Sequence, residues 1–485
     1  MTYPEAIQFL YGLRLFGAKF GLENTFQLAA LAGNPQDRLR FIHVAGTNGK
    51  GSTCAMLESI YRAAGLRVGL FTSPHLVSFR ERIQVNRQLI SESEVVRLVE
   101  ELQPLLKRFP ADHHPTFFEV ITLMALKFFA EQKCDLVIWE TGLGGRLDAT
   151  NIVTPLASVI TNIQFDHQQW LGDTLEKIAA EKAGIIKPGV PVVTAAEEPE
   201  ALAVIEKTAR EKNVRLIKVG QASSLSPSEE TKKSETGKMP VLPLPGEHQK
   251  LNAALALATV ETLQSEIPMS AAAIRTGLET VNWPGRLQLV TLPNSRRILL
   301  DGAHNVAGAK ALRETLSNWS SSFSLSGGTL KRELQRAELV LGAPITLILG
   351  VLQDKDWRHI CETLAPMAAR IFTVPVASER TAGARELAAA CRVANPPAEI
   401  TVCESLGEAL KGLHCLSIRG IGRADLPVGL DARQRVPTPD MLIVVTGSLY
   451  LVGEALELLG LSPATADERA LNEWSACPQP LHASG

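Results

Sequence analysis

The sequence predicts an α/β protein of two domains, each built on a mostly parallel β-sheet flanked by helices. Short apolar, β-branched runs alternate along the chain with amphipathic stretches of helical length. The apolar runs are continuous, which is typical of strands buried on both faces of a parallel sheet. A Trp-Pro-Gly break at residues 283–285 separates two such series. We therefore expect one domain at residues 1–284 and a second at 285–485.

In the first half, five apolar runs are expected to form strands, at residues 40–46, 134–140, 156–163, 190–195 and 214–219. Apolar residues recur at helical spacing between and after them, which predicts helices at 52–65, 119–132, 174–184 and 248–264. A polar, turn-rich stretch at 221–245 indicates a surface excursion.

The second half repeats the alternation of strands and helices. Strands are expected at residues 296–302, 345–350, 370–374 and 441–448. The intervening loops at about 318–335 and 416–438 are long and irregular, and nothing in them indicates chemistry.

The composition excludes several classes of protein. The 485 residues include 49 Lys and Arg against 51 Asp and Glu, and 45% are hydrophobic. This balance gives no support for nucleic-acid binding, which needs a basic excess. No apolar run reaches the length of about 18 residues that a membrane span requires, and the N-terminus lacks the pattern of a signal peptide. Seven cysteines without a CxxC pair disfavour disulfides and a zinc site, so we expect a reduced, cytoplasmic protein.

The strongest local signal is a glycine-rich turn between the first expected strand and the helix after it. Such a turn points successive backbone N–H groups into one concavity, at the positive end of a helix dipole. A lysine in it supplies charge for phosphate, and a serine hydroxyl can support Mg²⁺. The residues of this turn are Thr47, Asn48, Gly49, Lys50, Gly51 and Ser52. The P-loop pattern GxxxxGK[ST] is not met, because Gly51 follows the lysine, and an ordinary glycine-rich turn is the alternative.

Three polar residues after the first strands are candidates of a weaker kind. Glu140 ends a buried strand, where a P-loop protein holds a metal ligand, but alone it reads as an exposed strand-end residue. His167 follows the next strand and is a metal ligand or a loop histidine. Lys182 has small residues as neighbours, and the sequence alone favours its interpretation as part of a solvated helix face. The Gly-Leu-Gly-Gly after Glu140 permits close approach to a ligand, and Asp148 and Asn151 offer polar side chains to it.

In the second half, Asp301, His304 and Asn305 follow a strand, at the edge where ligands bind in open α/β sheets. Asp-Gly is also an ordinary turn. Arg286 just after the Pro-Gly break could reach a phosphate. No cluster of His and Cys with metal-ligand spacing and no G-x-S-x-G nucleophile motif is found, and the aromatic content of 5% is too low for a stacking platform for single-stranded nucleic acid.

Together, these motifs resemble the bifunctional dihydrofolate synthase/folylpolyglutamate synthase family, a branch of the Mur-ligase superfamily. Nine blocks occur in the family's order: GTNGKGS, TSPHL, FFE, E-x-GLGGRLDATN, DH-x-x-x-LG, EKAGI, HQ-x-LNAALALA, PGRLQ and DGAHN. The resemblance runs from about residue 15 to about 310, and thinly to 446–454. It implies a P-loop N-terminal domain and a smaller, Rossmann-like C-terminal domain, with ATP between them.

The resemblance also implies roles for particular residues. Residues 47–50 would cradle phosphate, and Lys50, His167, Lys182 and His304 would serve catalysis. Two magnesium ions would be held by Ser52, Ser73, Glu140, His167 and Lys182. Lys182 matches a lysine that is carbamylated in many members, which would convert its ammonium into a metal-facing carboxylate. This reverses the interpretation of Lys182 as part of a solvated helix face.

The remaining implied contacts are with nucleotide and pterin. Asn252, Arg286 and Asp301 resemble residues that hold adenine, phosphate and ribose, and His304 one near the nucleotide and the incoming glutamate. The pterin contacts would come from three stretches: Ala18, Lys19, Phe20 and Gly21; Thr116; and Leu147, Asp148, Ala149 and Thr150. The Leu-Asp-Ala-Thr form of the last stretch resembles the bifunctional members.

The implied reaction is ATP-dependent addition of L-glutamate to dihydropteroate and to the γ-carboxylate of folates, by a monomer that uses only small-molecule partners. Two alternatives are enzymes: one that only lengthens the glutamate tail, and a Mur-type ligase for another substrate. A third is a P-loop switch protein without synthetic activity. The sequence departs from the family at Val306, where many members have proline, and in the excursion at 221–240.

Overall fold

The computed structural model describes residues 1–16, 21–220, 241–294, 296–318, 345–413, 442–462 and 468. The chain forms two compact units, and the division falls between Trp283 and Pro284. The second unit extends to Ala466, and Glu468 belongs to the first unit again. The predicted boundary lies one residue from this division, but the return of the chain to the first unit was not predicted. The predicted excursion at 221–240 and the loop at 416–438 lie outside the described residues.

The first unit contains an eight-stranded sheet in the order β4-β3-β2-β5-β1-β6-β7-β8. Strands β2, β5, β1, β6, β7 and β8 are parallel, and β3 and β4 run antiparallel at one edge. The strands are β1 Phe41–Ala45, β2 Val68–Phe71, β3 Ile83–Val85, β4 Gln88–Leu89, β5 Leu136–Glu140, β6 Ala157–Ile160, β7 Val192–Thr194 and β8 Leu216–Lys218. The five predicted strands are confirmed, whereas β2, β3 and β4 were missed.

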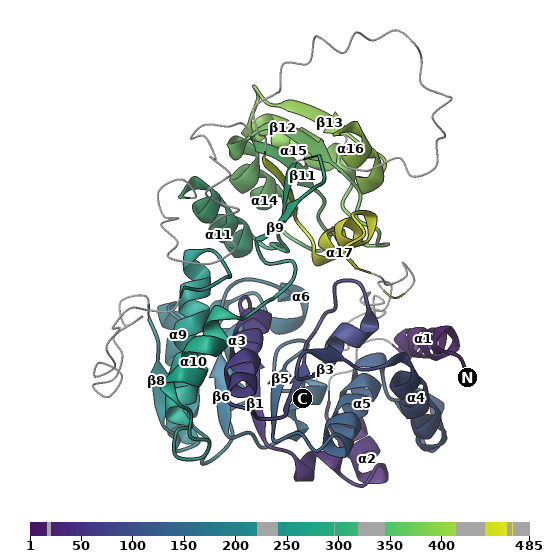
Figure 1. Cartoon of the computed structure of the whole chain (residues 1–485), viewed down its shortest axis with the longest axis vertical. Helices are drawn as coiled ribbons and strands as arrows, with labels where there is room; N and C mark the ends of the chain where they lie inside the picture. Colours follow the sequence, from purple (N-terminus) through teal and green to yellow (C-terminus); the bar gives the residue numbers. More distant parts are fainter. Residues whose placement is uncertain are drawn as a thin grey trace. The chain divides into compact units, whose positions relative to one another are not determined.

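Helices cover both faces of this sheet (Figure 1). They are α1 Tyr3–Gly12, α2 Glu23–Leu31, α3 Lys50–Ala63, α4 Glu92–Leu106, α5 Phe117–Glu131, α6 Gln168–Leu171, α7 Leu175–Ala183, α8 Pro199–Glu211, α9 Glu247–Thr262 and α10 Ala271–Glu279. Successive strand residues point to opposite faces, so each face has its own core. Ile42 and Val44 of β1 pack with α3, α9 and α10, whereas Phe41 packs with helices α4 and α5.

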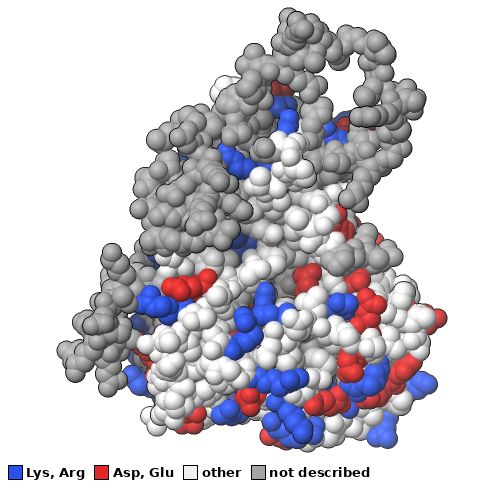
Figure 2. Space-filling model, viewed as in Figure 1, with Lys and Arg blue, Asp and Glu red and all other residues white. Residues whose placement is uncertain are grey.

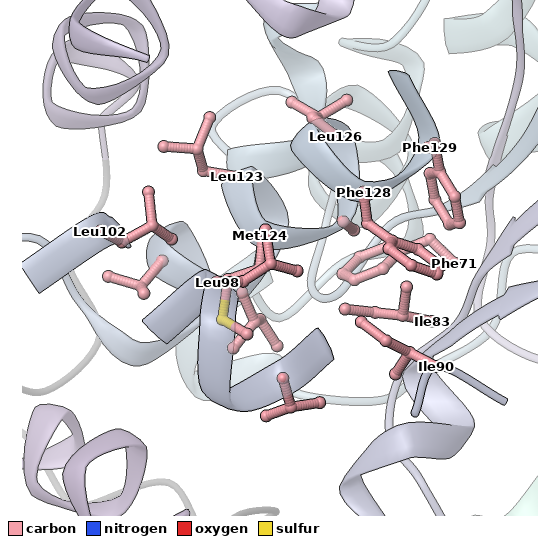
Figure 3. Packing of buried hydrophobic residues seen from close by; sticks show 14 of the residues in the cluster. Phe71, Ile83, Ile90, Leu98, Leu102, Leu123, Met124, Leu126, Phe128 and Phe129 are labelled. Atoms are coloured by element: carbon pink, nitrogen blue, oxygen red, sulfur yellow. The ribbon is translucent and has the colours of Figure 1, made fainter. Parts of the chain in front are cut away.

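Figure 3 shows part of the second of these cores, where Phe71 of β2 and Ile83 of β3 meet Phe128 and Phe129 of α5. Trp139 of β5 lies 4.5 Å from Phe71 between ring centroids, and its indole N–H donates to the carbonyl of Thr150 at 2.9 Å. Aromatic packing at the carboxyl end of β5 therefore supports the loop that follows this strand.

The second unit contains a six-stranded sheet in the order β13-β12-β11-β14-β10-β9, in which only β9 is antiparallel. Its strands are β9 Gln288–Thr291, β10 Arg297–Leu300, β11 Ile345–Leu349, β12 Ala368–Thr373, β13 Glu399–Val402 and β14 Leu442–Thr446. Its helices are α11 Val306–Ser317, α14 Trp357–Leu364, α15 Ala384–Ala394, α16 Leu406–Gly412 and α17 Leu449–Leu458. The prediction of two α/β domains with mostly parallel sheets is confirmed.

Charged side chains of both signs are interspersed over the face of the first unit seen in Figure 2. Ion pairs also form within α4 and α5, where Arg97 contacts Glu101 at 2.7 Å and Lys127 contacts Glu131 at 2.9 Å. Within the described part of the chain, no helix is both long and apolar enough to cross a membrane.

Candidate active site

The candidate site lies at the carboxyl edge of the central strands of the first unit. Strand β1 lies between β5 and β6 and is parallel to both. The glycine-rich turn follows β1, Glu140 ends β5, and the segment Thr161–His167 follows β6. Because the carboxyl ends of neighbouring parallel strands meet, the sheet brings these three groups together.

The glycine-rich turn is fixed by the segment that follows β6. The backbone N–H groups of Thr47 and Asn48 donate to the carbonyl and side-chain oxygens of Asn162, at 2.8 and 2.7 Å. The Thr161 hydroxyl donates to the Asn48 carbonyl at 2.7 Å. Gly46 has a φ of +147°, and a Cβ there would overlap the Thr161 side chain, so only glycine fits. The turn is thus held in one conformation before any ligand binds.

Two lysine side chains converge on the carbonyl of Gly46. Lys50, the first residue of α3, donates to it at 3.1 Å, and Lys182 of α7 donates at 2.8 Å. Lys182 is only 4% exposed, so the interpretation as a solvated helix face is wrong. Burial and the nearby Lys50 ammonium lower the pKa of Lys182 to about 7, although Asp166 and Asp148 act in the opposite direction.

Two residues of α9 face the start of α3. Gln249 donates to the Ser52 hydroxyl at 3.3 Å, and the Asn252 side chain lies where a Cβ of residue 49 would have to be. Gly49, at a φ of +85°, is therefore required both for its backbone conformation and for the approach of Asn252. The structure brings Asn252 to the predicted phosphate loop.

Glu140 and Ser73 form a second polar group at this edge. Glu140 is 4% exposed, so the reading as an exposed strand-end residue is wrong, and its carboxylate accepts from the Ser73 backbone N–H at 3.2 Å. His167 has a φ of +50° and immediately precedes α6. Its backbone N–H donates to the Asp166 carboxylate at 2.8 Å.

Among the predicted metal ligands at this edge, Glu140 offers a carboxylate, and Ser52 and Ser73 offer hydroxyls. These hard oxygens fit Mg²⁺, which takes few protein ligands and completes its shell with water and substrate phosphate. Among the described residues, no three His, Cys, Asp or Glu side chains are grouped as a metal site.

The Gly-Leu-Gly-Gly loop packs closely against α7. A Cβ on Gly145 would lie 2.9–3.0 Å from carbonyl oxygens at the end of α7, so glycine is needed there for packing. The approach of this loop to a ligand stays a prediction. Asn151 also faces protein and donates to the Arg146 carbonyl at 2.9 Å.

Asp148 and Thr150 of the same loop are buried. Asp148 accepts from the Leu143 N–H at 2.7 Å and from the Thr150 hydroxyl, which in turn accepts from His43 Nε2 at 2.9 Å. Burial raises the pKa of Asp148 and lowers that of His43 to about 3. A role of Asp148 and Asn151 toward a ligand stays a prediction, as does a pterin contact of residues 147–150. Of these residues, Leu147 is half-buried.

The other predicted pterin contacts have mixed outcomes. Thr116 is the N-cap of α5, where its hydroxyl accepts from the Glu119 N–H at 3.3 Å and Glu119 bonds back to the Thr116 N–H at 2.7 Å. Ala18, Lys19 and Phe20 lie outside the described residues, and Gly21 is described, with a φ of +148°. A role in pterin binding stays a prediction for all of them.

In the second unit, Asp301 organises the end of β10. Its carboxylate accepts from the Leu287 N–H and the Ala303 N–H, both at 2.9 Å. Arg286 reaches the same turn, where its guanidinium lies 2.7 Å from the position a Cβ of Gly302 would take. His304 donates from Nδ1 to the Gly302 carbonyl at 2.8 Å. The three predicted residues of this unit therefore lie together on adjoining turns.

Sequence reasoning missed several residues that the structure places at the carboxyl edge of the sheet in the first unit. Asn162 and Gln249 hold the phosphate loop and Ser52, as described above. His75 and Arg82 are buried beside Ser73. Gln249 and His75 stand inside quoted motif blocks, which was the available signal. Asn162 and Arg82 lie outside these blocks and gave none.

Comparisons with known proteins agree with this geometry. A family model described as the Mur ligase middle domain matches residues 44–260. The dihydrofolate synthase/folylpolyglutamate synthase of Bacillus subtilis is 37% identical over 413 residues, which cover 81% of this chain and 90% of the relative. Among solved structures, folylpolyglutamate synthase from Thermotoga maritima has a TM-score of 0.75 at 32% identity and covers 96% of this chain and 99% of its own.

A third similar protein is the Escherichia coli enzyme solved in complex with DHPP and ADP, with a TM-score of 0.74 at 29% identity, covering 95% of this chain and 98% of its own. The fold, the phosphate loop and these matches define an ATP-dependent, amide-forming ligase of the Mur superfamily. Within that class, the chain belongs to the dihydrofolate synthase/folylpolyglutamate synthase family. The resemblance drawn from the sequence motifs is confirmed.

Proposed function

We propose that this chain joins L-glutamate to dihydropteroate and to the γ-carboxylate of folates, with ATP as co-substrate. The observation that carries the proposal is the convergence of Lys50 and Lys182 on Gly46, beside the buried Glu140. The names of the relatives supply the substrate class, since the Bacillus subtilis and Escherichia coli enzymes are both dihydrofolate synthase/folylpolyglutamate synthases.

A carboxylate does not condense with an amine in water, because it is a poor electrophile. Transfer of the γ-phosphoryl group of ATP to the carboxylate gives an acyl phosphate and ADP. The amino group of glutamate then attacks the acyl carbon, and the tetrahedral intermediate expels phosphate to leave the amide. Most of the protein's contribution is to position these groups and to neutralise their charge.

The phosphate loop performs the first part of this task. The backbone N–H groups at the start of α3 and the Lys50 ammonium face the position of the ATP phosphates, where they stabilise the charge that develops during transfer. Ser52, Ser73, Glu140, His167 and the modified Lys182 are the residues proposed to hold two magnesium ions. When bound, Mg²⁺ would offset the negative charge of the phosphate groups.

Lys182 is proposed to carry a carbamate. The reaction needs a neutral amine, which attacks CO₂ and releases a proton as the N–C bond forms. A pKa of about 7 leaves a large fraction of Lys182 neutral at physiological pH. The small residues Ala179 and Ala183 next to it leave room for the modified side chain.

Asn252 and the residues of the second unit are proposed to hold the rest of ATP. Arg286 offers a charge for phosphate, Asp301 a carboxylate for ribose, and His304 a group near the nucleotide and glutamate. The chain is further proposed to act as a cytoplasmic monomer.

A single assay tests the proposal. The protein is incubated with ATP, L-glutamate and either dihydropteroate or tetrahydrofolate, and the products are separated by mass. Products one glutamate heavier from both acceptors support the bifunctional enzyme, and products from tetrahydrofolate alone indicate a folylpolyglutamate synthase. ADP release that needs neither acceptor nor glutamate would refute the ligase assignment.

A further inference from the structure

A line of hydrogen bonds connects Glu468, near the end of the chain, with Ser73. Glu468 is buried, and its carboxylate oxygen Oε2 accepts from the Ser78 hydroxyl and the Phe79 N–H, both at 2.8 Å. The Tyr3 hydroxyl donates to the same oxygen at 3.0 Å. Three donors on one buried carboxylate oxygen fix the position of Glu468 against the loop at residues 73–82.

The main-chain carbonyl of Glu468 fixes the next side chain. It accepts from His75 Nε2 at 2.9 Å, while His75 Nδ1 bonds to Arg82 Nε at 2.8 Å. A guanidinium has donors only, so Nδ1 must be the acceptor and the proton must lie on Nε2. The two contacts therefore define both the tautomer and the ring orientation of His75.

Arg82 transmits this orientation to Ser73. Its Nη1 donates to the Ser73 hydroxyl at 2.9 Å, and its guanidinium lies 5.6 Å from the ring centroid of Phe117. The Ser73 N–H is bonded to the Glu140 carboxylate. A hydroxyl oxygen has two lone pairs, and the bond from Arg82 occupies one of them, so the other has a defined direction.

We propose that Glu468 is a positioning residue for Ser73, which it orients through the juxtaposed side chains of His75 and Arg82. The inference rests on the proposed role of Ser73 as a magnesium ligand. Partners that orient a metal ligand affect metal affinity without touching the ion. Glu468 would thus act on a proposed metal ligand of its own unit without touching the ion.

A purely structural role for Glu468 is less consistent with the contacts, because the loop has another anchor. The Glu81 carboxylate accepts from the N–H groups of Leu76, Val77 and Ser78, at 2.7, 2.9 and 2.7 Å. The loop backbone is thus held from within. What Glu468 adds is the contact with the His75 ring, on which the orientation of Arg82 depends.

The test measures metal binding without turnover. Mn²⁺ is titrated by electron paramagnetic resonance into the full-length protein saturated with a non-hydrolysable ATP analogue, and affinity for the analogue alone is measured with EDTA present. The variants are Glu468→Ala and His75→Asn, because the asparagine amide offers an acceptor to Arg82 but has no atom at the position of Nε2, which bonds to the Glu468 carbonyl. Tyr3→Phe is the matched control, since it removes a bond to the same carboxylate without altering the loop.

The proposal expects Glu468→Ala and His75→Asn to weaken Mn²⁺ binding about tenfold, with nucleotide affinity retained and Tyr3→Phe like the wild type. Unchanged Mn²⁺ binding in His75→Asn overturns the proposal, and so does an equal loss of metal and nucleotide affinity in the variants. If Glu468→Ala does not fold, the result for His75→Asn alone is the test. Ser73→Ala separates the two hypotheses. If it leaves Mn²⁺ binding intact, the proposed role of Ser73 fails; if it alone weakens binding, only the role of Glu468 fails.

Discussion

Lys50 and Lys182 donate hydrogen bonds to the same main-chain oxygen, that of Gly46, at 3.1 and 2.8 Å. Two ammonium groups at one acceptor repel each other, and one of them is buried, so the arrangement favours loss of a proton from Lys182. The two lysines therefore suit different proposed roles: Lys50 would supply charge to phosphate, and Lys182 would supply an amine that can be modified.

Lys50→Ala should abolish ATP-dependent product formation, with turnover reduced by about a hundredfold or more, because backbone N–H groups alone cannot replace the charge of the ammonium. Turnover is measured by ADP release in the presence of both acceptor and glutamate. Lys177→Ala is the control, since Lys177 is exposed on α7 and pairs with Asp173. A Lys50→Ala enzyme with near-normal turnover would exclude the phosphate-loop assignment.

Lys182→Ala should be inactive, and short carboxylic acids such as acetate should partly restore its activity. The reason is that the cavity left by the side chain can admit a free carboxylate in place of the carbamate. The measurement is turnover as a function of acid concentration. Lys50→Ala, which lacks a charge and not a carboxylate, should show no such rescue. If Lys182→Ala is as active as the parent, the carbamate hypothesis is wrong.

Lys182→Met should be more stable than the parent at pH 7 in buffer depleted of CO₂, by roughly 2–4 kcal/mol in the free energy of unfolding. Folding lowers the pKa of Lys182 from 10.5 to about 7, so between these values the unfolded chain binds more protons. The parent's stability therefore rises with pH in this window, and methionine has no proton to bind. The difference in free energy of unfolding between Lys182→Met and the parent should narrow from pH 7 to pH 10, which urea unfolding can measure. A difference that does not depend on pH would contradict the lowered pKa of Lys182.

Gly46→Ala should lower nucleotide affinity at least tenfold and destabilise the fold by about 1–3 kcal/mol. The added Cβ overlaps Thr161, which holds the phosphate loop. Gly65→Ala is the matched control, because Gly65 also has a positive φ, of +88°, but has open space around it. Urea unfolding and binding of ADP measure the two effects. Equal loss of nucleotide affinity in both variants would show that the overlap with Thr161 is not the cause.

The central strands β1 and β5 were predictable from the sequence, and the edge strands β4 and β9 were not, although the edge strand β8 was predicted and the buried strand β2 was missed. β1 and β5 lie at the centre of the sheet and are buried throughout, so their composition alone identifies them. β4 has two residues, Gln88 and Leu89, both exposed, and β9 is an antiparallel edge strand that is only partly buried. Neither contains enough buried residues for a recognisable pattern.

The site was predictable where residues cluster in sequence and not where they meet only in the fold. The predicted phosphate loop is a continuous segment, so a single motif was enough to propose its role. The burial of Lys182 depends on contact with Gly46, 136 positions away, which helical periodicity cannot indicate. Glu468 has partners 389 and 390 positions away, and a single glutamate there has no local signal.

Helix α3 is buried on all sides, since every residue from Ser52 to Tyr61 is inaccessible to solvent. Ser59 donates to the Gly277 carbonyl of α10 at 2.7 Å, and a Cβ on Gly277 would collide with the backbone of α3. The phosphate loop thus begins a helix that cannot shift without disturbing the core. Because the loop is already ordered when the protein folds, nucleotide should bind with little loss of backbone entropy. The amides of α3 should exchange hydrogen only through global unfolding.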